Sequence, residues 1–275
     1  MKKFKGLGMS VTGYPDQGRK KVTRIAREVG YNAIDSFCGP GGMGLGLEWA
    51  GFNVGVAFDF DEPSVETYRH NLSGQCFVAD ANLISGDDLL SLICAKKGEV
   101  ALVAGGPPCQ GFSKQKRGAH NGDKRNDLVL EFVRLISEIE PRFFLFENVA
   151  IFGQVRGKRH LAEMHRRLRE YVFYPSIYNA ADYGVPQTRE RFVLVGRRKD
   201  EKCRFRIPAP TTVRRKTVGD VIGDLPEPPL DCSEHPDFPN HARTKITQIN
   251  IERFKHVPQG GGWQNIPMRL RLPCH

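Results

Sequence analysis

One stretch is the most informative about the fold of this chain: Asn32-Ala33-Ile34-Asp35-Ser36-Phe37-Cys38-Gly39-Pro40-Gly41-Gly42-Met43-Gly44. Its first part, residues 32–37, is a short apolar run of the kind that forms a buried strand. Its second part is rich in glycine, which lets the backbone turn tightly and approach a ligand closely. A helical pattern follows at about 43–50. A strand, a glycine loop and a helix in this order predict the first unit of an α/β sheet.

The same alternation continues along the chain. Further apolar runs predict strands at residues 53–58, 100–104, 142–146 and 191–196. Helical patterns lie between them, at about 62–72, 86–97, 126–140 and 158–171. We therefore predict an α/β fold with a doubly wound, mainly parallel sheet of Rossmann-like type. In such sheets ligands bind outside the carboxyl ends of the strands, so the chemistry is expected just after these runs.

Two segments fall outside the alternation. Residues 1–30 form a basic N-terminal extension with a short helical pattern at Lys20–Val29. Residues 208–275 are interrupted repeatedly by proline and contain a run of three glycines at 260–262. We therefore expect one core at 31–207, followed by an irregular linker or tail at 208–275.

Charge favours a polyanionic partner such as nucleic acid. The chain has 41 Lys and Arg against 31 Asp and Glu, and residues 151–216 alone hold 17 basic and 6 acidic residues. The alternative is a solvated helical face at Arg156–Arg169. The seven cysteines are scattered and form no Cys-x-x-Cys pair, so the sequence supports neither a zinc site nor a disulfide framework. No run approaches membrane-spanning length, and a reducing cytoplasm fits best.

The glycine loop predicts a nucleotide-like ligand. Gly39, Gly41 and Gly44 fit a G-x-G-x-x-G pattern, and Asp59 lies where a carboxylate holds the ribose hydroxyls of an adenosine-containing cofactor. The pattern does not separate a dinucleotide from S-adenosylmethionine, and a merely structural turn is the alternative. Asp80 is placed either to contact the adenine amino group or to cap a helix.

A second motif presents a thiol. Gly105-Gly106-Pro107-Pro108-Cys109-Gln110-Gly111-Phe112-Ser113 puts one cysteine behind a rigid Pro-Pro step, just after the apolar run Val100–Val103. This order predicts a nucleophile at the carboxyl edge of the sheet. The alternative is a buried cysteine that acts only as a small apolar residue.

Acidic and basic candidates follow downstream. The strand pattern Arg142–Phe146 leads into Glu147, whose pKa should rise after four apolar residues, making it a proton donor near neutral pH. Arg189 and Arg191 are two residues apart, on the same side of an extended segment, and can donate to phosphate or base oxygens. For the arginines the alternative is a surface ion pair with Glu190.

Together these motifs resemble cytosine-5 DNA methyltransferases. The resemblance rests on Asp35–Gly44, Gly106–Gln110, Glu147–Val149 and Gln187–Arg191, which agree in type, order and spacing over residues 32–200. It implies that residues 31–207 are a catalytic domain of the S-adenosylmethionine-dependent methyltransferase type. It also implies duplex DNA as substrate, a cytosine flipped out of the helix, and a bacterial, cytoplasmic and nucleoid-associated enzyme of a restriction–modification system.

The resemblance also assigns roles to single residues. It implies contacts to S-adenosyl-L-methionine from Phe37, Gly39, Gly41, Asp59, Phe60, Asp80 and Pro107. In catalysis, Cys109 resembles the nucleophile that adds to cytosine carbon 6, Glu147 the acid at ring nitrogen 3, and Arg189 and Arg191 the arginines at the flipped base. The resemblance also implies that four residues position the substrate: Pro108, Gln110, Ser113 and Asn148.

The sequence departs from the family after the Gln-x-Arg-x-Arg motif. Family members usually continue into a target-recognition domain, an Arg-containing motif and a closing Gly-Asn-Ser/Ala-Val helix, and we find no equivalent of these. We therefore expect one subunit of a split enzyme whose second polypeptide supplies them. The alternatives are a truncated, inactive DNA-binding remnant and a tRNA cytosine-5 methyltransferase. A nicotinamide dehydrogenase is supported only by the glycine loop.

Overall fold

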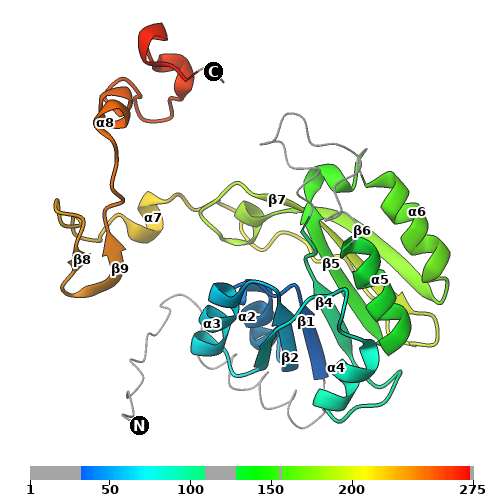
Figure 1. Ribbon diagram of the computed structural model, residues 1–275. Coiled ribbons are helices and arrows are strands. Elements are labelled where there is room, and N and C mark those ends of the chain that lie inside the picture. The colour runs from blue at the N-terminus through cyan, green and yellow to red at the C-terminus, as the bar shows by residue number, and fades with distance from the viewer. Residues whose placement is uncertain (1–31, 109–127, 155–156, 273–275) are drawn as a thin grey trace, which may run out of the picture. The chain divides into compact units, whose positions relative to one another are not determined.

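The computed structural model describes residues 32–108, 128–154 and 157–272 (Figure 1). Its main sheet has the strand order β3-β2-β1-β4-β5-β7-β6. The strands are β1 (Asn32–Ser36), β2 (Asn53–Asp59), β3 (Gln75–Val78), β4 (Leu102–Gly105), β5 (Phe143–Val149), β6 (Tyr171–Asn179) and β7 (Glu190–Arg198). Strands β1 to β5 pair in parallel, and β7 is antiparallel to both of its neighbours. The predicted mainly parallel α/β sheet is confirmed.

Helices cover both faces of this sheet (Figure 1). They are α2 (Gly42–Trp49), α3 (Glu62–Asn71), α4 (Gly86–Leu92), α5 (Leu128–Ile139) and α6 (Lys158–Arg167). On one face Leu47 of α2 packs with Ala33 and Val54. On the other, α4, α5 and α6 share a second apolar cluster with Ile34. Because Ala33 and Ile34 are consecutive strand residues, they point to opposite faces, and the sheet is doubly wound.

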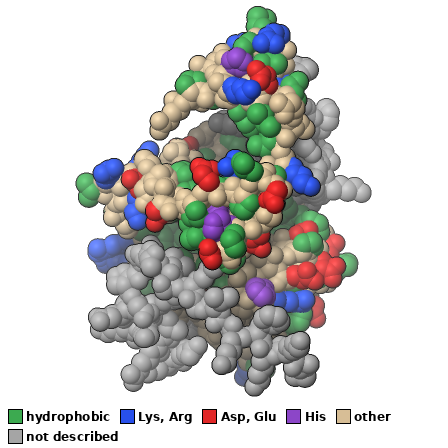
Figure 2. Space-filling view, turned by 90° about the vertical axis from the view of Figure 1, so that its left-hand side faces the viewer, with side chains coloured by type: hydrophobic (Ala, Val, Ile, Leu, Met, Phe, Trp, Pro, Cys, Tyr) green, Lys and Arg blue, Asp and Glu red, His purple; other side chains and the backbone are tan. Residues whose placement is uncertain are grey.

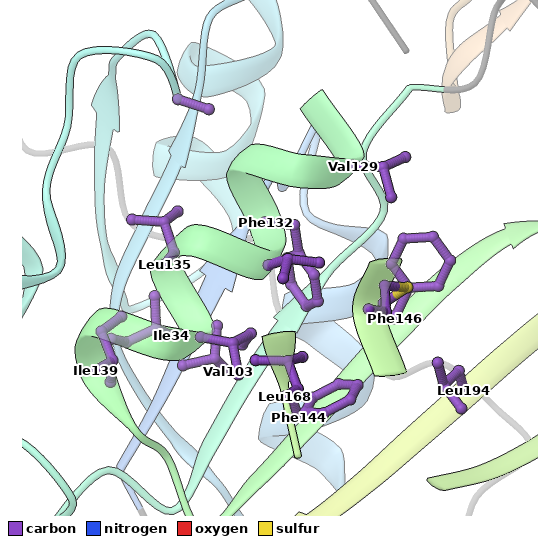
Figure 3. Close-up of a cluster of buried hydrophobic side chains, with 14 of the residues drawn as sticks. Ile34, Val103, Val129, Phe132, Leu135, Ile139, Phe144, Phe146, Leu168 and Leu194 are labelled. Atoms are coloured by element: carbon purple, nitrogen blue, oxygen red, sulfur yellow. The ribbon is translucent and has the colours of Figure 1, made fainter. Parts of the chain in front are cut away.

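The larger apolar cluster fixes α5 against the centre of the sheet (Figure 3). Phe132 of α5 is fully buried, and its ring centroid lies 6.2 Å from that of Phe144 and 5.7 Å from that of Phe146. Both partners lie on β5, the strand that leads to Glu147. Aromatic contacts at this spacing are favourable beyond the area they bury. The strand that carries the predicted acid is therefore held rigidly.

The structure differs from the sequence prediction at two strands and two helix ends. Strands β3 and β6 were not among the predicted runs; β6 is an edge strand, where Pro175 removes no hydrogen bond from the sheet interior. The predicted helix 86–97 ends at Leu92, shortly before Cys94 takes a left-handed φ of 53°. The predicted helix 158–171 ends at Arg167, and Tyr171 already begins β6. The predicted helix at Lys20–Val29 lies outside the described residues.

The chain divides into two compact units, Met1–Thr217 and Val218–His275. The second contains α7 (Gly219–Ile222), β8 (Glu234–His235), β9 (Phe238–Ala242) and α8 (Gln248–Phe254). Short 3₁₀ turns are found at Ala150–Phe152, Ala180–Tyr183, Trp263–Asn265 and Met268–Leu270. Neither α7 nor α8 buries a residue, and apolar side chains are exposed on the surface (Figure 2). Among the described residues, no helix has the length and apolar character needed to cross a membrane.

Candidate active site

Four neighbouring strand ends bring the predicted residues to one edge of the sheet. The parallel register pairs Ser36 with both Phe58 and Gly105, and Gly105 with Phe146. The next residue of each strand or loop therefore follows at the same edge: Phe37, Asp59, Gly106 and Glu147. The glycine loop, the candidate ribose-binding acid, the segment leading to Cys109 and the candidate catalytic acid thus meet at the carboxyl ends of β1, β2, β4 and β5.

The glycine loop is held by the acid predicted to bind ribose. Asp59 Oδ2 accepts a hydrogen bond of 2.8 Å from the Gly39 amide, and Asp59 Oδ1 accepts one of 3.0 Å from the Asp61 amide. Phe37, Gly39 and Gly41 all have left-handed φ angles, of 55°, 51° and 101°. The turn thus needs glycine where its backbone is most strained. Asp59 shapes the loop in addition to any contact with a ligand.

Two further predicted cofactor residues, Phe60 and Asp80, lie open to solvent. Phe60, directly after β2, is 70% exposed. Asp80 is exposed and follows β3, and its Oδ1 accepts hydrogen bonds from the Asn82 amide and side chain at 2.9 and 2.7 Å. The N-cap of α4 is Ser85, so the alternative interpretation of Asp80 as a helix cap is wrong. An exposed aromatic ring and an exposed carboxylate are suited to a planar base with an amino group.

Sequence reasoning gave no role to Asp35, which the structure buries beneath the glycine loop. Its side chain is fully buried, and within the described residues neither carboxyl oxygen has a hydrogen-bond partner. Burial raises the pKa of Asp35 to about 7; the Gly44 backbone opposes this rise, and the charge of Asp59 adds to it. The hydroxyl of Tyr68 is also buried, and no described residue forms a hydrogen bond with it. The signal in the sequence was a carboxylate inside an apolar strand pattern.

Glu147 and Arg191 form an ion pair across two strands. Arg191 Nε lies 2.8 Å from Glu147 Oε1, and their side chains are 26% and 31% exposed. In the antiparallel register Val193 faces Glu147, so Arg191 is its diagonal neighbour. Burial raises the pKa of Glu147, in the predicted direction, while Arg191 and Arg189 oppose the rise. The partner of Arg191 is thus Glu147; at Glu190 it contacts only the backbone oxygen.

The segment that leads to Cys109 is tied to the same strand. Asn148 is buried, and its Nδ2 donates a hydrogen bond of 3.1 Å to the carbonyl oxygen of Pro107. A Cβ at Gly106 would lie 3.1 Å from Glu147 Oε2, so any larger residue would crowd the carboxylate at this point. Pro107 is buried and Pro108 half-buried. Cys109, Gln110 and Ser113 lie outside the described residues.

The basic helix of the sequence prediction behaves as a solvated face. On α6, Arg166 and Arg167 both contact the carboxylate of Glu163, at 2.6 and 2.5 Å, and both are exposed. Both arginines thus share one carboxylate within the helix, in i,i+3 and i,i+4 pairs that are typical of a solvated helical surface. The alternative of a solvated helical surface therefore holds for α6, and this helix is no evidence for a nucleic-acid partner.

Comparison with known sequences finds DNA methyltransferases. The family model for C-5 cytosine-specific DNA methylase matches residues 31–270. Type II methyltransferase M1.HphI of Haemophilus parahaemolyticus is 37% identical over 244 residues, which cover 86% of this chain and 64% of that protein. M.XorII of Xanthomonas oryzae is 38% identical over 200 residues, covering 70% of this chain and 46% of M.XorII. The chain thus spans less than two thirds of these relatives.

Solved structures share the same fold. A prophage-encoded Escherichia coli protein, described as a candidate DNA modification methyltransferase, superposes with a TM-score of 0.65 at 28% identity, covering 84% of this chain and 66% of that one. A Spodoptera frugiperda DNMT2 structure superposes with a TM-score of 0.52 at 18% identity, covering 64% and 52%. The second likeness concerns the fold alone.

Proposed function

The chain belongs to the C-5 cytosine-specific DNA methylase family, and from that premise we propose that it transfers a methyl group to carbon 5 of cytosine in duplex DNA. The observation that carries the proposal is the Glu147–Arg191 pair beside Gly106. It puts an acid of raised pKa and a guanidinium next to the segment that leads to Cys109, on the sheet edge that also holds the glycine loop.

The proposed cofactor is S-adenosyl-L-methionine, which supplies an electrophilic methyl group when bound. The side chains around the glycine loop fit its adenosine part, since Asp59 lies at the loop and Phe60 is exposed beside it. We assign ribose binding to Asp59, packing on the adenine ring to Phe60 and a polar adenine contact to Asp80. Phe37, Gly39, Gly41 and Pro107 complete the proposed contacts.

In the proposed mechanism this chain's residues act on a cytosine flipped out of the duplex, because carbon 6 is not accessible inside stacked bases. The Cys109 thiolate forms a bond to carbon 6, while protonated Glu147 donates to ring nitrogen 3 and Arg191 binds the base carbonyl. Carbon 5 then becomes the nucleophile that takes the methyl group. Transfer of the carbon 5 proton to water restores the double bond and expels Cys109 as its thiolate, and the nitrogen 3 proton returns to Glu147. A free thiol has a pKa of about 8.5, so the site must favour the thiolate.

The experiment is methyl transfer from labelled S-adenosylmethionine, with duplex DNA and tRNA compared as acceptors. In the presence of the second polypeptide proposed below, we expect transfer to DNA, covalent trapping on 5-fluorocytosine DNA, and loss of both in Cys109→Ala. Cys94→Ala is the matched control, because Cys94 is an exposed thiol that follows α4. Transfer that persists in Cys109→Ala contradicts the mechanism, and transfer to tRNA alone contradicts the proposed substrate.

The same proposal includes a second polypeptide. The unit Val218–His275 exposes large apolar side chains, among them Leu230 at 84%, Phe254 at 58% and Met268 at 84%. A recognition subunit of a split restriction–modification enzyme, acting on nucleoid DNA in a bacterial cytoplasm, would cover such a surface. We expect site-specific methylation only after such a subunit is added. Site-specific methylation by the purified chain alone would contradict this part of the proposal.

A further inference from the structure

Arg134 on α5 joins that helix to the loop between β3 and α4. Its Nη2 donates to the carbonyl oxygens of Ala81 and Ile84, at 2.7 and 2.9 Å. Its Nε contacts Glu131 at 2.7 Å, and its Nη1 contacts the carboxylate of Glu138 at 2.8 and 2.9 Å. All three guanidinium nitrogens thus have partners, and two of the contacts join residues 53 and 50 positions apart in the sequence.

The loop that Arg134 holds is closed at both ends. Its first residue is Asp80, whose carbonyl oxygen accepts hydrogen bonds from the amides of Leu83 and Ile84, at 2.9 and 3.1 Å. At its far end Glu138 Oε2 accepts the Gly86 amide at 2.6 Å. Glu138 is also the ion-pair partner of Arg134. One side-chain network on α5 therefore fixes the geometry of residues 80–86.

Asp80 is presented by this loop toward solvent. Its Oδ1 is taken by Asn82, whereas its Oδ2 accepts no hydrogen bond from the described residues. The start of the loop is joined to the ribose-binding edge, because the Ala79 amide donates to the backbone oxygen of Asp59 at 2.9 Å. Asp80 Oδ2 thus lies on a segment whose position is fixed by a backbone hydrogen bond to β2 before it and by the hydrogen bonds of Arg134 after it.

We propose that Arg134 is a positioning residue that sets Asp80 to accept the adenine amino group, and so makes the cofactor site selective for adenine. This inference rests on the proposed function. Without the guanidinium, the carbonyls of Ala81 and Ile84 lose their donor, and Glu131 and Glu138 lose a shared counter-charge. The loop then relaxes, and the hydrogen bond to the base weakens by roughly three- to tenfold in affinity.

The test uses the full chain and calorimetric binding of S-adenosylhomocysteine and of S-inosylhomocysteine, which has an oxygen in place of the amino group. The wild type should prefer the adenosine compound. In Arg134→Met the ratio of the two affinities should fall toward one. The fall should be smaller in Arg134→Lys, which keeps the charge but cannot bridge both carbonyls. The matched control is Arg142→Met, which breaks a bidentate pair with Glu201 at the opposite end of β5.

The preference ratio separates positioning from a general loss of structure. In methyl-transfer assays Arg134→Met should raise KM for S-adenosylmethionine and leave kcat nearly unchanged. An equal loss of affinity for both compounds, or a ratio that stays at the wild-type value in folded Arg134→Lys, would overturn the inference. A wild type that binds neither compound would overturn the proposed function, and this inference with it. If the Arg142→Met ratio also falls, the effect is not specific to Arg134.

Discussion

The two halves of the sheet edge are built differently. Around β1 and β2 the geometry is set by the backbone: the Gly39 and Asp61 amides are fixed to Asp59, and left-handed residues shape the turn. Around β5 and β7 it is set by charged side chains, since Glu147 and Arg191 contact each other while remaining about one third exposed. The first half presents a fixed shape, and the second presents charges that can exchange partners.

This difference separates binding from chemistry. A rigid backbone loop suits a cofactor that binds in a single orientation and whose adenosine part does not change during the reaction. An acid paired to a guanidinium suits a base that must displace part of that pair, because both groups then turn to substrate atoms. We therefore expect substitutions in the first half to change cofactor affinity or folding, and those in the second half to change the rate.

The largest effect is expected for Glu147→Gln. The amide cannot donate the proton that nitrogen 3 needs, so methyl transfer should slow by roughly 10²- to 10⁴-fold. Affinity for S-adenosylmethionine should stay within about twofold, because Glu147 lies on the other half of the edge. Single-turnover methylation and calorimetry measure the two quantities, with Glu190→Gln, on the same sheet, as control. A comparable loss of cofactor affinity would remove the distinction between the halves.

The next effect tests the fixed shape of the loop. Gly41 has a φ of 101°, and a Cβ there would lie 2.9 Å from Tyr68 Cδ2 and closer still to Leu72. Gly39, with a φ of 51°, has nothing within 4 Å of its Cβ position. Gly39→Ala should cost about 1 kcal/mol of unfolding free energy, and Gly41→Ala roughly 2–4 kcal/mol. Urea unfolding measures both losses. Equal losses would show that the positive φ, and not the steric clash of the added Cβ, determines the cost.

Local signals predicted the first half of the edge better than the second. The alternation of Asn32–Gly44 and the twenty-residue spacing to Asp59 are local properties, and the structure places these residues together. The contact of Glu147 with Arg191 depends on the register between β5 and β7, which no local pattern specifies. Strand β6 was missed because Pro175 interrupts its pattern and because it is the edge strand of the described sheet. The burial of Asp35 arises only when α2 and α3 close over the strand.

The third effect concerns pH and the buried Asp35. Its folded pKa of about 7 lies above the ordinary value of 3.8, so the folded state holds this proton more tightly than the unfolded state. Stability is therefore lost as pH rises from about 4 to 7. In Asp35→Asn the loss of unfolding free energy between pH 5 and 8 should be smaller by roughly 2–3 kcal/mol. Denaturant titrations at both pH values test this, and identical pH slopes would contradict it.

The smallest effect separates the two roles of Asp59. In Asp59→Asn one side-chain oxygen remains, so the loop can keep its hydrogen bond from the Gly39 amide, while the charge that favours ribose hydroxyls is lost. Affinity for S-adenosylmethionine should fall by roughly 10- to 100-fold, with kcat little changed at saturating cofactor. Asp61→Asn is the control, because asparagine still caps α3 at the Ser64 amide. A fall in kcat equal to that of Glu147→Gln would mean that the loop governs chemistry as well as binding.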